Sequence, residues 1–562
     1  MADYLFQLSI SPVQKFISQA RKTKDLFAGS KIISDLIKYQ LEQFKEKPNV
    51  KIILPDLQNS SLPNRTVLKI SDKTETEMKA FIKECEQYFE NSLKKVYEST
   101  YIKFNDNSDY SDLKDYFQLH YAAVEMKDDY KTAYNKLGKK HAAIKNVVSF
   151  QQLGNGEGEQ GRKCSICGER NGMIYHKAKK PTFIMENAIS YDGNELQKNE
   201  TLCQVCALKR FYKYAGFPST AEICLATVIS NNELKELKNK GIDPQILYKE
   251  NLNEDYLKKN LIELDLDQVK EIVNEQIMKR NELKDSDLPR YYAMIMFDGD
   301  KMGKLFSGED LQDNIDLEEF HIQAAQAISQ NALESKKIVD KVGKTVYAGG
   351  DDFFGFCTVD KLLPTLKKLQ ASFQENVHQK LIQYKEYNDE ITMSAGAVIA
   401  HYKTPLHIVL NWLRKMEDAA KHEGERNSFA LAVLKHSGEI HRSVLKWNDE
   451  NESNLGIISE IVDKLRSKMF STNFIHTLES EFKNISYKSD NLNATAYLSL
   501  FHAELRRLLN RSYIPKQGNK EEVEKMLTLC KSLSNLFEDN RNKYFSLMKI
   551  IDFIARKLGG ER

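Results

Sequence analysis

The chain has 562 residues, too many for one hydrophobic core, so we expect two to four domains. Its 82 basic and 80 acidic residues leave a net charge of +2, which argues against a protein that coats nucleic acid nonspecifically. A net charge this small still allows local basic patches. The apolar runs are far shorter than the roughly 20 residues of a spanning helix, and the first residues lack the order of a signal peptide, so we expect a soluble cytoplasmic protein with no membrane partner.

The first domain is predicted at 1–150. Residues 1–10 alternate as a strand does, Pro12 ends that strand, and 13–41 carries apolar residues at helical spacing. The rest of this domain is predicted to hold short strands and two charged helices, with the strands at 50–54 and 66–70 and the helices at about 73–98 and 109–135.

Two cysteine pairs follow a glycine-rich stretch at 154–161. They form a CxxC…CxxC pattern with 35 residues between the pairs, made by Cys164, Cys167, Cys203 and Cys206. Each pair can direct two thiolates at one tetrahedral ion, so the pattern favours a structural zinc site over a redox pair. We therefore predict a zinc-binding and helical domain at 151–284, in which 231–284 forms exposed helices.

A third domain is predicted at 285–440 and a C-terminal helical bundle at 441–562. The order in the third domain is strand, helical segment, hairpin, helix, strand, helix, strand, which suits a ferredoxin-like sheet with helices on one face. Its strands are expected at 291–297, 344–348, 353–359, 391–400 and 429–434, and its helices at 315–336 and 406–421.

Two adjacent carboxylates, Asp351 and Asp352, follow Gly349 and Gly350 inside an otherwise apolar strand pattern. Such a pair repels unless a cation or a protonation offsets the repulsion. Asp298 ends the strand expected beside this hairpin, so three carboxylates are predicted to converge. Clustered oxygen ligands select Mg²⁺ or Mn²⁺, and two such ions can hold a nucleotide's phosphates. The alternative is an acidic turn in solvent.

Lys421 is predicted at the end of an amphipathic helix that faces this edge of the sheet. Its charge could neutralise phosphates or could simply complement the helix dipole.

Four motifs together resemble a known family: FDGDKMG at 297–303, YAGGDDFFGF at 347–356, SAGAVIAH at 394–401 and AAKHEGERN at 419–427. They are similar to the palm of GGDEF-type diguanylate cyclases and, more closely, of the large polymerase/cyclase-like subunit of type III CRISPR effector complexes. The stretch at 10–37 resembles the first palm of the type III-B (Cmr) form. The resemblance implies an α+β multidomain protein with two ferredoxin-like, nucleotidyl cyclase-like palms, a zinc-binding domain between them and a C-terminal helical bundle.

The resemblance also implies roles for individual residues. Asp298, Asp351 and Asp352 would hold two Mg²⁺ or Mn²⁺ ions. The other roles concern the nucleotide: Gly349 and Gly350 would turn against the triphosphate, Ser394 would line the pocket with Asp300 nearby, and Lys421 would contact phosphate.

In the first palm, Ser11-Pro12-Val13 stands where the second has Asp298-Gly299-Asp300. We therefore expect no metal there but an acceptor nucleotide, with Ser11 among its contacts.

The function implied is adenylyl transfer from ATP, triggered by target RNA, in a complex with guide RNA and the other Cmr subunits. The product is left open between cyclic oligoadenylate and an AMP conjugate of S-adenosylmethionine. Because the chain opens on the palm and contains no His-Asp dipeptide, we expect the form without an HD nuclease domain and no DNase activity. The alternatives are a catalytically silent RNA-binding scaffold and a free-standing GGDEF-like cyclase.

Overall fold

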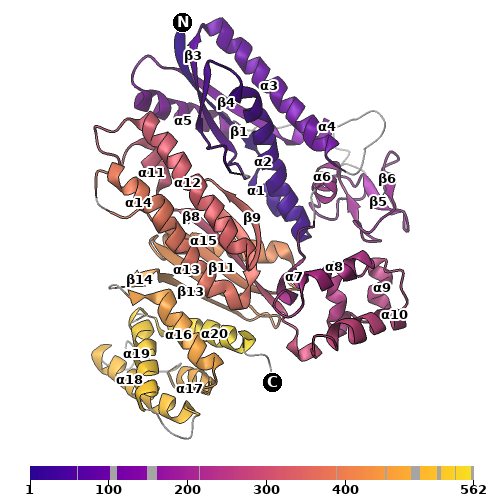
Figure 1. The fold of residues 1–562 in the computed structure, drawn as a ribbon, viewed down its shortest axis with the longest axis vertical. Helices are drawn as coiled ribbons and strands as arrows, with labels where there is room; N and C mark the ends of the chain where they lie inside the picture. The colour runs from indigo at the N-terminus through magenta and orange to yellow at the C-terminus, as the bar shows by residue number, and fades with distance from the viewer. Residues whose placement is uncertain are drawn as a thin grey trace.

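The computed structural model places the elements along one elongated molecule, with the first sheet at the N-terminal end and the C-terminal helices at the other (Figure 1). None of the helices it describes is both long enough and apolar enough to span a bilayer. The predicted glycine-rich stretch at 154–161 lies, except for Gly161, outside the described residues, which are 1–59, 61–100, 111–147, 161–213, 216–387, 389–449, 452–482, 494–514, 520–537 and 540–558.

A four-stranded antiparallel sheet forms the first domain, in the order β2-β3-β1-β4. With a helix after the first strand and another after the third, this is the ferredoxin-like arrangement. Helices α2 and α3 cover one face and α5 the other. The elements are β1 (Ala2–Ser11), α1 (Gln14–Ser18), α2 (Thr23–Lys45), β2 (Val50–Leu54), β3 (Arg65–Lys73), α3 (Glu75–Glu98), α4 (Ser111–Tyr116), β4 (Gln118–Glu125) and α5 (Tyr130–Asn146).

The predicted helix at 109–135 is wrong, because β4 occupies its middle. His120, Ala122 and Val124 are buried at alternate positions, which is the period of a strand. The charged residues on either side of this short run concealed the alternation. The predicted helix at 13–41 is likewise divided, into α1 and α2.

The cysteine pairs flank a small three-stranded sheet: Cys164 and Cys167 lie before its first strand, and Cys203 and Cys206 lie at the start of α6, which follows its last. Short helices lead from there to the second large sheet (Figure 1). The prediction of exposed helices at 231–284 is wrong in part, because Leu234, Leu237 and Ile246 are buried in the core beneath that sheet. The elements are β5 (Ile174–His176), β6 (Ile189–Tyr191), β7 (Thr201–Leu202), α6 (Gln204–Phe211), α7 (Thr220–Leu225), α8 (Asn231–Asn239), η1 (Pro244–Leu247), η2 (Lys249–Asn251), α9 (Glu254–Asn260), α10 (Leu266–Glu271), η3 (Ile272–Met278) and η4 (Asp285–Asp287).

A six-stranded sheet in the order β13-β12-β11-β8-β10-β9 forms the centre of the molecule. Its last four strands repeat the ferredoxin-like order of the first sheet. Beyond them, β12 pairs parallel to β11 and β13 antiparallel to β12. The strands are β8 (Tyr291–Gly299), β9 (Gly343–Gly349), β10 (Asp352–Thr358), β11 (Met393–His401), β12 (Ser428–Leu434) and β13 (Ile440–Lys446).

Helices cover both faces of this sheet, so the expectation of helices on one face is wrong. β8 is apolar on both sides: Ile295 packs with α12 and α13, while Met294 packs with α15 on the other face. A sheet apolar on both faces needs cover on both. The elements are α11 (Met302–Ser307), α12 (Leu317–Asp340), η5 (Val359–Lys361), α13 (Leu362–Phe373), η6 (Gln374–His378), α14 (Gln379–Leu381), η7 (Ile382–Tyr384) and α15 (Leu406–His422).

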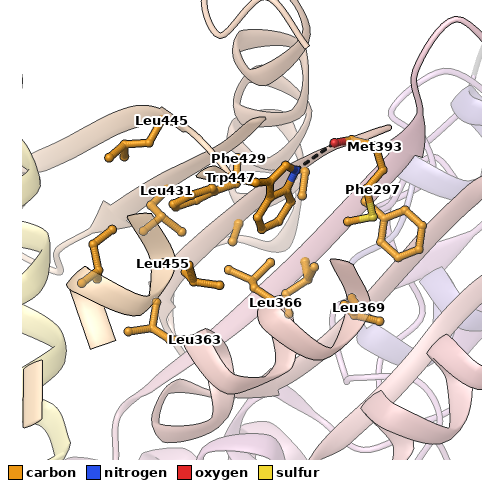
Figure 2. Close-up of a cluster of buried hydrophobic side chains, with 14 of the residues drawn as sticks. Phe297, Leu363, Leu366, Leu369, Met393, Phe429, Leu431, Leu445, Trp447 and Leu455 are labelled. Atoms are coloured by element: carbon orange, nitrogen blue, oxygen red, sulfur yellow. Dashed lines mark hydrogen bonds between the residues drawn. The ribbon is translucent and has the colours of Figure 1, made fainter. Parts of the chain in front are cut away.

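The C-terminal helices share a core with this sheet, centred on Trp447 (Figure 2). Its indole N–H donates to the carbonyl oxygen of Met393 at 2.9 Å, and Phe429, Leu366 and Leu455 surround the ring. The remaining elements are β14 (Asn448–Asp449), β15 (Glu452–Ser453), α16 (Asn454–Arg466), α17 (Asn473–Phe482), α18 (Ala494–Ser512), α19 (Lys520–Asn535) and α20 (Arg541–Leu558).

Candidate active site and zinc site

Asp298, Asp351 and Asp352 lie together, with carboxylate oxygens all within 4.8 Å of one another. The antiparallel pairing of β8 with β10 explains this, because Phe297 lies opposite Phe353, so that Asp298, which follows Phe297, meets Asp351 and Asp352, which precede Phe353. The sequence expectation that these carboxylates converge thus agrees with the geometry.

The two glycines before the acids serve different purposes. Gly350 has φ +66° in the turn between Gly349 and Asp352, a conformation that favours glycine. A Cβ on Gly349 would lie 2.5 Å from the carbonyl oxygen of Ser61 in the first domain. This backbone contact alone excludes a side chain at 349, in addition to the role toward the triphosphate that the resemblance implies for both glycines.

The acids are electrostatically unfavourable to one another. Burial and the charge of Asp298 raise the pKa of Asp351 to about 6. Although Asp352 keeps much of its surface in solvent, desolvation of its carboxyl and contact with Asp298 raise its pKa as well. A divalent cation would relieve the repulsion between these crowded carboxylates, and oxygen ligands are those that Mg²⁺ and Mn²⁺ prefer. The donor set therefore fits Mg²⁺ or Mn²⁺.

Lys421, in the last turn of α15, contacts both Asp298 and Glu417 through its ammonium group. Burial alone would lower the pKa of Lys421, but these two acids raise it above its usual range. Glu417 was not predicted from the sequence, although its spacing of four residues from Lys421 on one helix could have indicated it.

Asp300 is separate from the three clustered acids. It is nearly buried, and its carboxylate accepts hydrogen bonds from the hydroxyls of Thr392 at 2.8 Å and Ser394 at 2.7 Å and from the Asn427 N–H at 3.0 Å. Ser394 is fully buried, so it does not line a pocket as predicted. Ser394 instead ties β11 to Asp300 at the end of β8. Asp300 also binds the loop after α15, and it lies in the wall of the neighbouring cavity, near where the nucleotide was expected.

A cavity of about 520 Å³ lies beside the acids, with Lys421 shared between the two. Three consecutive wall residues are in the left-handed region, namely Glu425 (φ 51°), Arg426 (φ 63°) and Asn427 (φ 45°). Such strain persists only where surrounding contacts hold it, and it is concentrated at functional sites. Here Lys446 donates to the carbonyl oxygens of Glu425 and Arg426.

The cations of this cavity were only partly predicted. Besides Lys421, its wall includes Lys301, Lys385 and Arg426. Their proximity depends on the fold of three separate segments, although Lys301 and Arg426 both lie inside the quoted motifs.

The first sheet presents a smaller polar group at the corresponding place. Ser11 ends β1, and its hydroxyl lies 2.7 Å from Nε2 of His120 on β4. Arg65 on the neighbouring β3 lies close enough to Asp351 for its charge to lower the pKa of that carboxyl, against the larger effects that raise it. The two domains therefore meet near the acids.

The four predicted zinc ligands converge, with sulfur atoms all within 4.8 Å of one another and no disulfide among them. Backbone N–H groups of Ile166 and Cys206 lie 3.5 and 3.4 Å from the sulfurs of Cys164 and Cys203. These contacts favour thiolates, so the site fits a tetrahedral zinc ion.

Comparison with known proteins supports this organisation. Two family models match the chain, "Cas10/Cmr2, second palm domain" over residues 291–430 and "CRISPR-associated protein Cmr2, N-terminal" over residues 5–151. The chain is 24% identical over 569 aligned residues to the CRISPR system Cmr subunit Cmr2 of Pyrococcus furiosus, covering 79% of this chain and 63% of that protein. It is 21% identical over 393 residues to the single-strand-specific deoxyribonuclease Cas10/Csm1 of Streptococcus thermophilus, covering 68% of this chain and 47% of that protein. The chain thus spans less than two thirds of the length of either relative.

The fold is also similar to chains in two solved type III-B Cmr-beta structures, the apo state and the state bound to cognate target RNA. The TM-score is 0.64 for both, with 14% and 15% sequence identity, and the match covers all of this chain and 82% and 83% of those chains. Both family models describe parts of one kind of protein. The N-terminal model matches the first sheet domain, and the second-palm model matches the second. The chain therefore belongs to the Cas10/Cmr2 family, as a Cmr2-type protein of type III-B CRISPR systems.

Proposed function

We propose that this protein is a metal-dependent nucleotidyltransferase that uses ATP in a type III-B RNA-guided complex. The observation that carries the proposal is the convergence of Asp298, Asp351 and Asp352 beside a cavity whose wall is shared with Lys421. The palm family is nucleotidyl cyclase-like, which agrees with this geometry.

Asp298, Asp351 and Asp352 would hold Mg²⁺ or Mn²⁺. The metal, when bound, would supply charge stabilisation at the phosphates and activation of the attacking hydroxyl. Lys421, Lys301 and Arg426 carry positive charge on the cavity side and would bind the phosphates of ATP.

In the reaction, an acceptor hydroxyl forms a bond to the α-phosphorus while the bond to pyrophosphate breaks. Pyrophosphate and one proton are released.

The first domain would hold the acceptor near Ser11 and His120, beside the contact between the two sheets. The acceptor decides between cyclic oligoadenylate and an AMP conjugate of S-adenosylmethionine. Guide RNA, target RNA and other Cmr subunits are the proposed partners. The solved relative bound to cognate target RNA supports this assignment by analogy of fold.

The test is pyrophosphate release from ATP by the assembled complex, with and without target RNA. We expect RNA-dependent release that Asp351→Asn and Asp352→Asn abolish while assembly is retained. Glu254→Gln, an exposed carboxylate on α9, is the matched control and should leave release unchanged. No release by the wild type would indicate the scaffold alternative, and release from GTP without RNA the free-standing cyclase. Mass spectrometry of the product, with and without S-adenosylmethionine, would identify the acceptor.

A further inference from the structure

The hairpin that carries Asp351 and Asp352 is held from one side by the first domain. Asn59, which is 7% exposed, donates its side-chain N–H to the carbonyl oxygen of Ala348 at 2.9 Å. The side-chain oxygen of Asn59 accepts the backbone N–H of Ser61 at 3.1 Å. A single buried side chain thus joins a loop of the first domain to the strand directly before the acids. A buried amide of this kind is costly to leave unpaired.

The backbone of the same loop lies against the hairpin. The carbonyl oxygen of Ser61 leaves no room for a side chain at Gly349, where a Cβ would approach to 2.5 Å. Pro63 lies 3.6 Å from the Cβ position of Gly350. This contact is made to β9, the edge strand of the six-stranded sheet. Within the sheet, β9 pairs with β10 only, so its other edge faces the loop. The loop therefore supports the one side of the hairpin that the sheet itself does not fix.

The loop is in turn anchored to α2. The hydroxyl of Ser34 accepts the backbone N–H of Leu62 at 2.5 Å and donates to its carbonyl oxygen at 3.2 Å. Toward its N-terminal end, α2 is fixed by Asp25, which forms a fully buried ion pair with Arg210 of α6, at 2.6 and 2.9 Å. Arg210 lies on the helix that begins at the cysteine pair Cys203 and Cys206. The zinc module, α2 and the loop are therefore connected by buried polar contacts.

We infer that Asn59 is a positioning residue for the acidic hairpin. Asp298 belongs to β8, whereas Asp351 lies in the turn and Asp352 begins β10, so a shift of the hairpin tip separates the metal ligands. Asn59 fixes the turn where the three carboxylates meet. The first domain thereby contributes to the metal site without supplying a ligand. This inference rests on the proposed function only in treating the acids as metal ligands.

The test uses the full chain and two variants that act from opposite sides of the contact. Asn59→Leu removes the hydrogen bond to Ala348, and Gly349→Ala forces the loop and hairpin apart. Ser61→Ala is the matched control, because it keeps both backbone groups that make the contacts. Two quantities are measured for each: hydrogen exchange of the amides at 346–354, and Mn²⁺ affinity by electron paramagnetic resonance.

We expect faster exchange of the hairpin in both variants and Mn²⁺ binding weakened on the order of tenfold or more, as for the loss of groups that orient metal ligands. Zinc content and exchange within α2 should stay at wild-type levels, and Ser61→Ala should match the wild type throughout. Exchange and affinity both within twofold of the wild type would overturn the inference. Faster exchange with unchanged Mn²⁺ affinity would also overturn it, because the contact would then be merely structural. Absence of pyrophosphate release by the wild type would refute the proposed function but leave these measurements valid.

Discussion

Lys421 contacts Asp298 directly, although the two residues lie on α15 and β8, on different elements of the second sheet domain. Glu417 contacts the same ammonium group from one turn earlier on the helix. Lys421 is thus held by two acids at the boundary between the acidic cluster and the cavity. A cation fixed in this way needs little reorganisation to meet a phosphate.

Replacing Lys421 by Met should therefore lower pyrophosphate release on the order of a hundredfold, the size of effect seen when a preorganised charge is removed from a reacting phosphate or oxyanion. The measurement is release from ATP by the assembled complex. Lys415→Met, on the exposed side of the same helix, is the control and should change little. Equal loss in both variants would show that the helix, and not the charge at Lys421, is responsible.

The substitution Asp351→Asn should stabilise the protein while it removes activity. The pKa of Asp351 is raised from 3.8 to about 6, so its ionisation opposes folding. The protonated carboxyl of Asp351 contributes to the free energy of unfolding in full below about pH 4, and this contribution is lost as the pH rises through about 6.

In the presence of a chelator, Asp351→Asn should accordingly melt at a higher temperature than the wild type near neutral pH, and the difference should shrink toward pH 4. Thermal melts across this range are the measurement. Asp267→Asn, a carboxylate with 94% of its side chain exposed, should show no such difference. A variant less stable than the wild type at neutral pH would contradict the assigned repulsion.

Arg210→Leu should loosen α2 strongly. It leaves Asp25 and Glu200 buried without their counter-charge, and breaking a buried pair from one side costs about 3–5 kcal/mol. The free energy of opening of α2, measured by hydrogen exchange, should fall accordingly. Lys258→Leu breaks an exposed pair with Glu254 and should cost less than about 1 kcal/mol. Similar values for the two variants would argue against a structural role for the buried pair.

Cys164→Ser should lose the zinc ion and unfold the module around α6, because metal binding supplies folding energy to sites of this type. Metal content by mass spectrometry and exchange within α6 are the measurements. Cys224→Ser changes a buried thiol outside the cluster and should retain zinc. Full zinc content in Cys164→Ser would show that this cysteine is not a ligand.

The parts of the site that the sequence predicted depend on local patterns. Asp298 follows a run of apolar residues that forms a strand, and the Gly-Gly-Asp-Asp motif forms a hairpin by its own turn chemistry. The pairing of these two strands then follows from the ferredoxin-like order. The cysteine pairs are equally local.

What the sequence did not predict depends on contacts between distant segments. Asn59 and Ala348 are 289 positions apart, and although Ala348 lies in the quoted motif at 347–356, Asn59 belongs to no motif. β13 was missed because it is an edge strand with exposed residues such as Ile440 and Arg442 on one face, which weakens the apolar signal. Ser394 was assigned to the pocket by analogy, but a strand buried on both faces turns its hydroxyl inward to Asp300.

The left-handed run at 425–427 has a practical consequence for anyone who shortens this protein. Lys446 and the backbone of Trp447, which donates to the carbonyl oxygen of Asn427 at 3.2 Å, lie after the last predicted strand. A fragment that stops at Leu434 would keep every acid of the cluster and Lys421, yet release the loop that carries Arg426. Fragments of the second sheet domain should therefore extend at least through Trp447. A fragment trimmed to the quoted motifs would lack the contacts that hold the loop, so a negative result in an assay would be misleading.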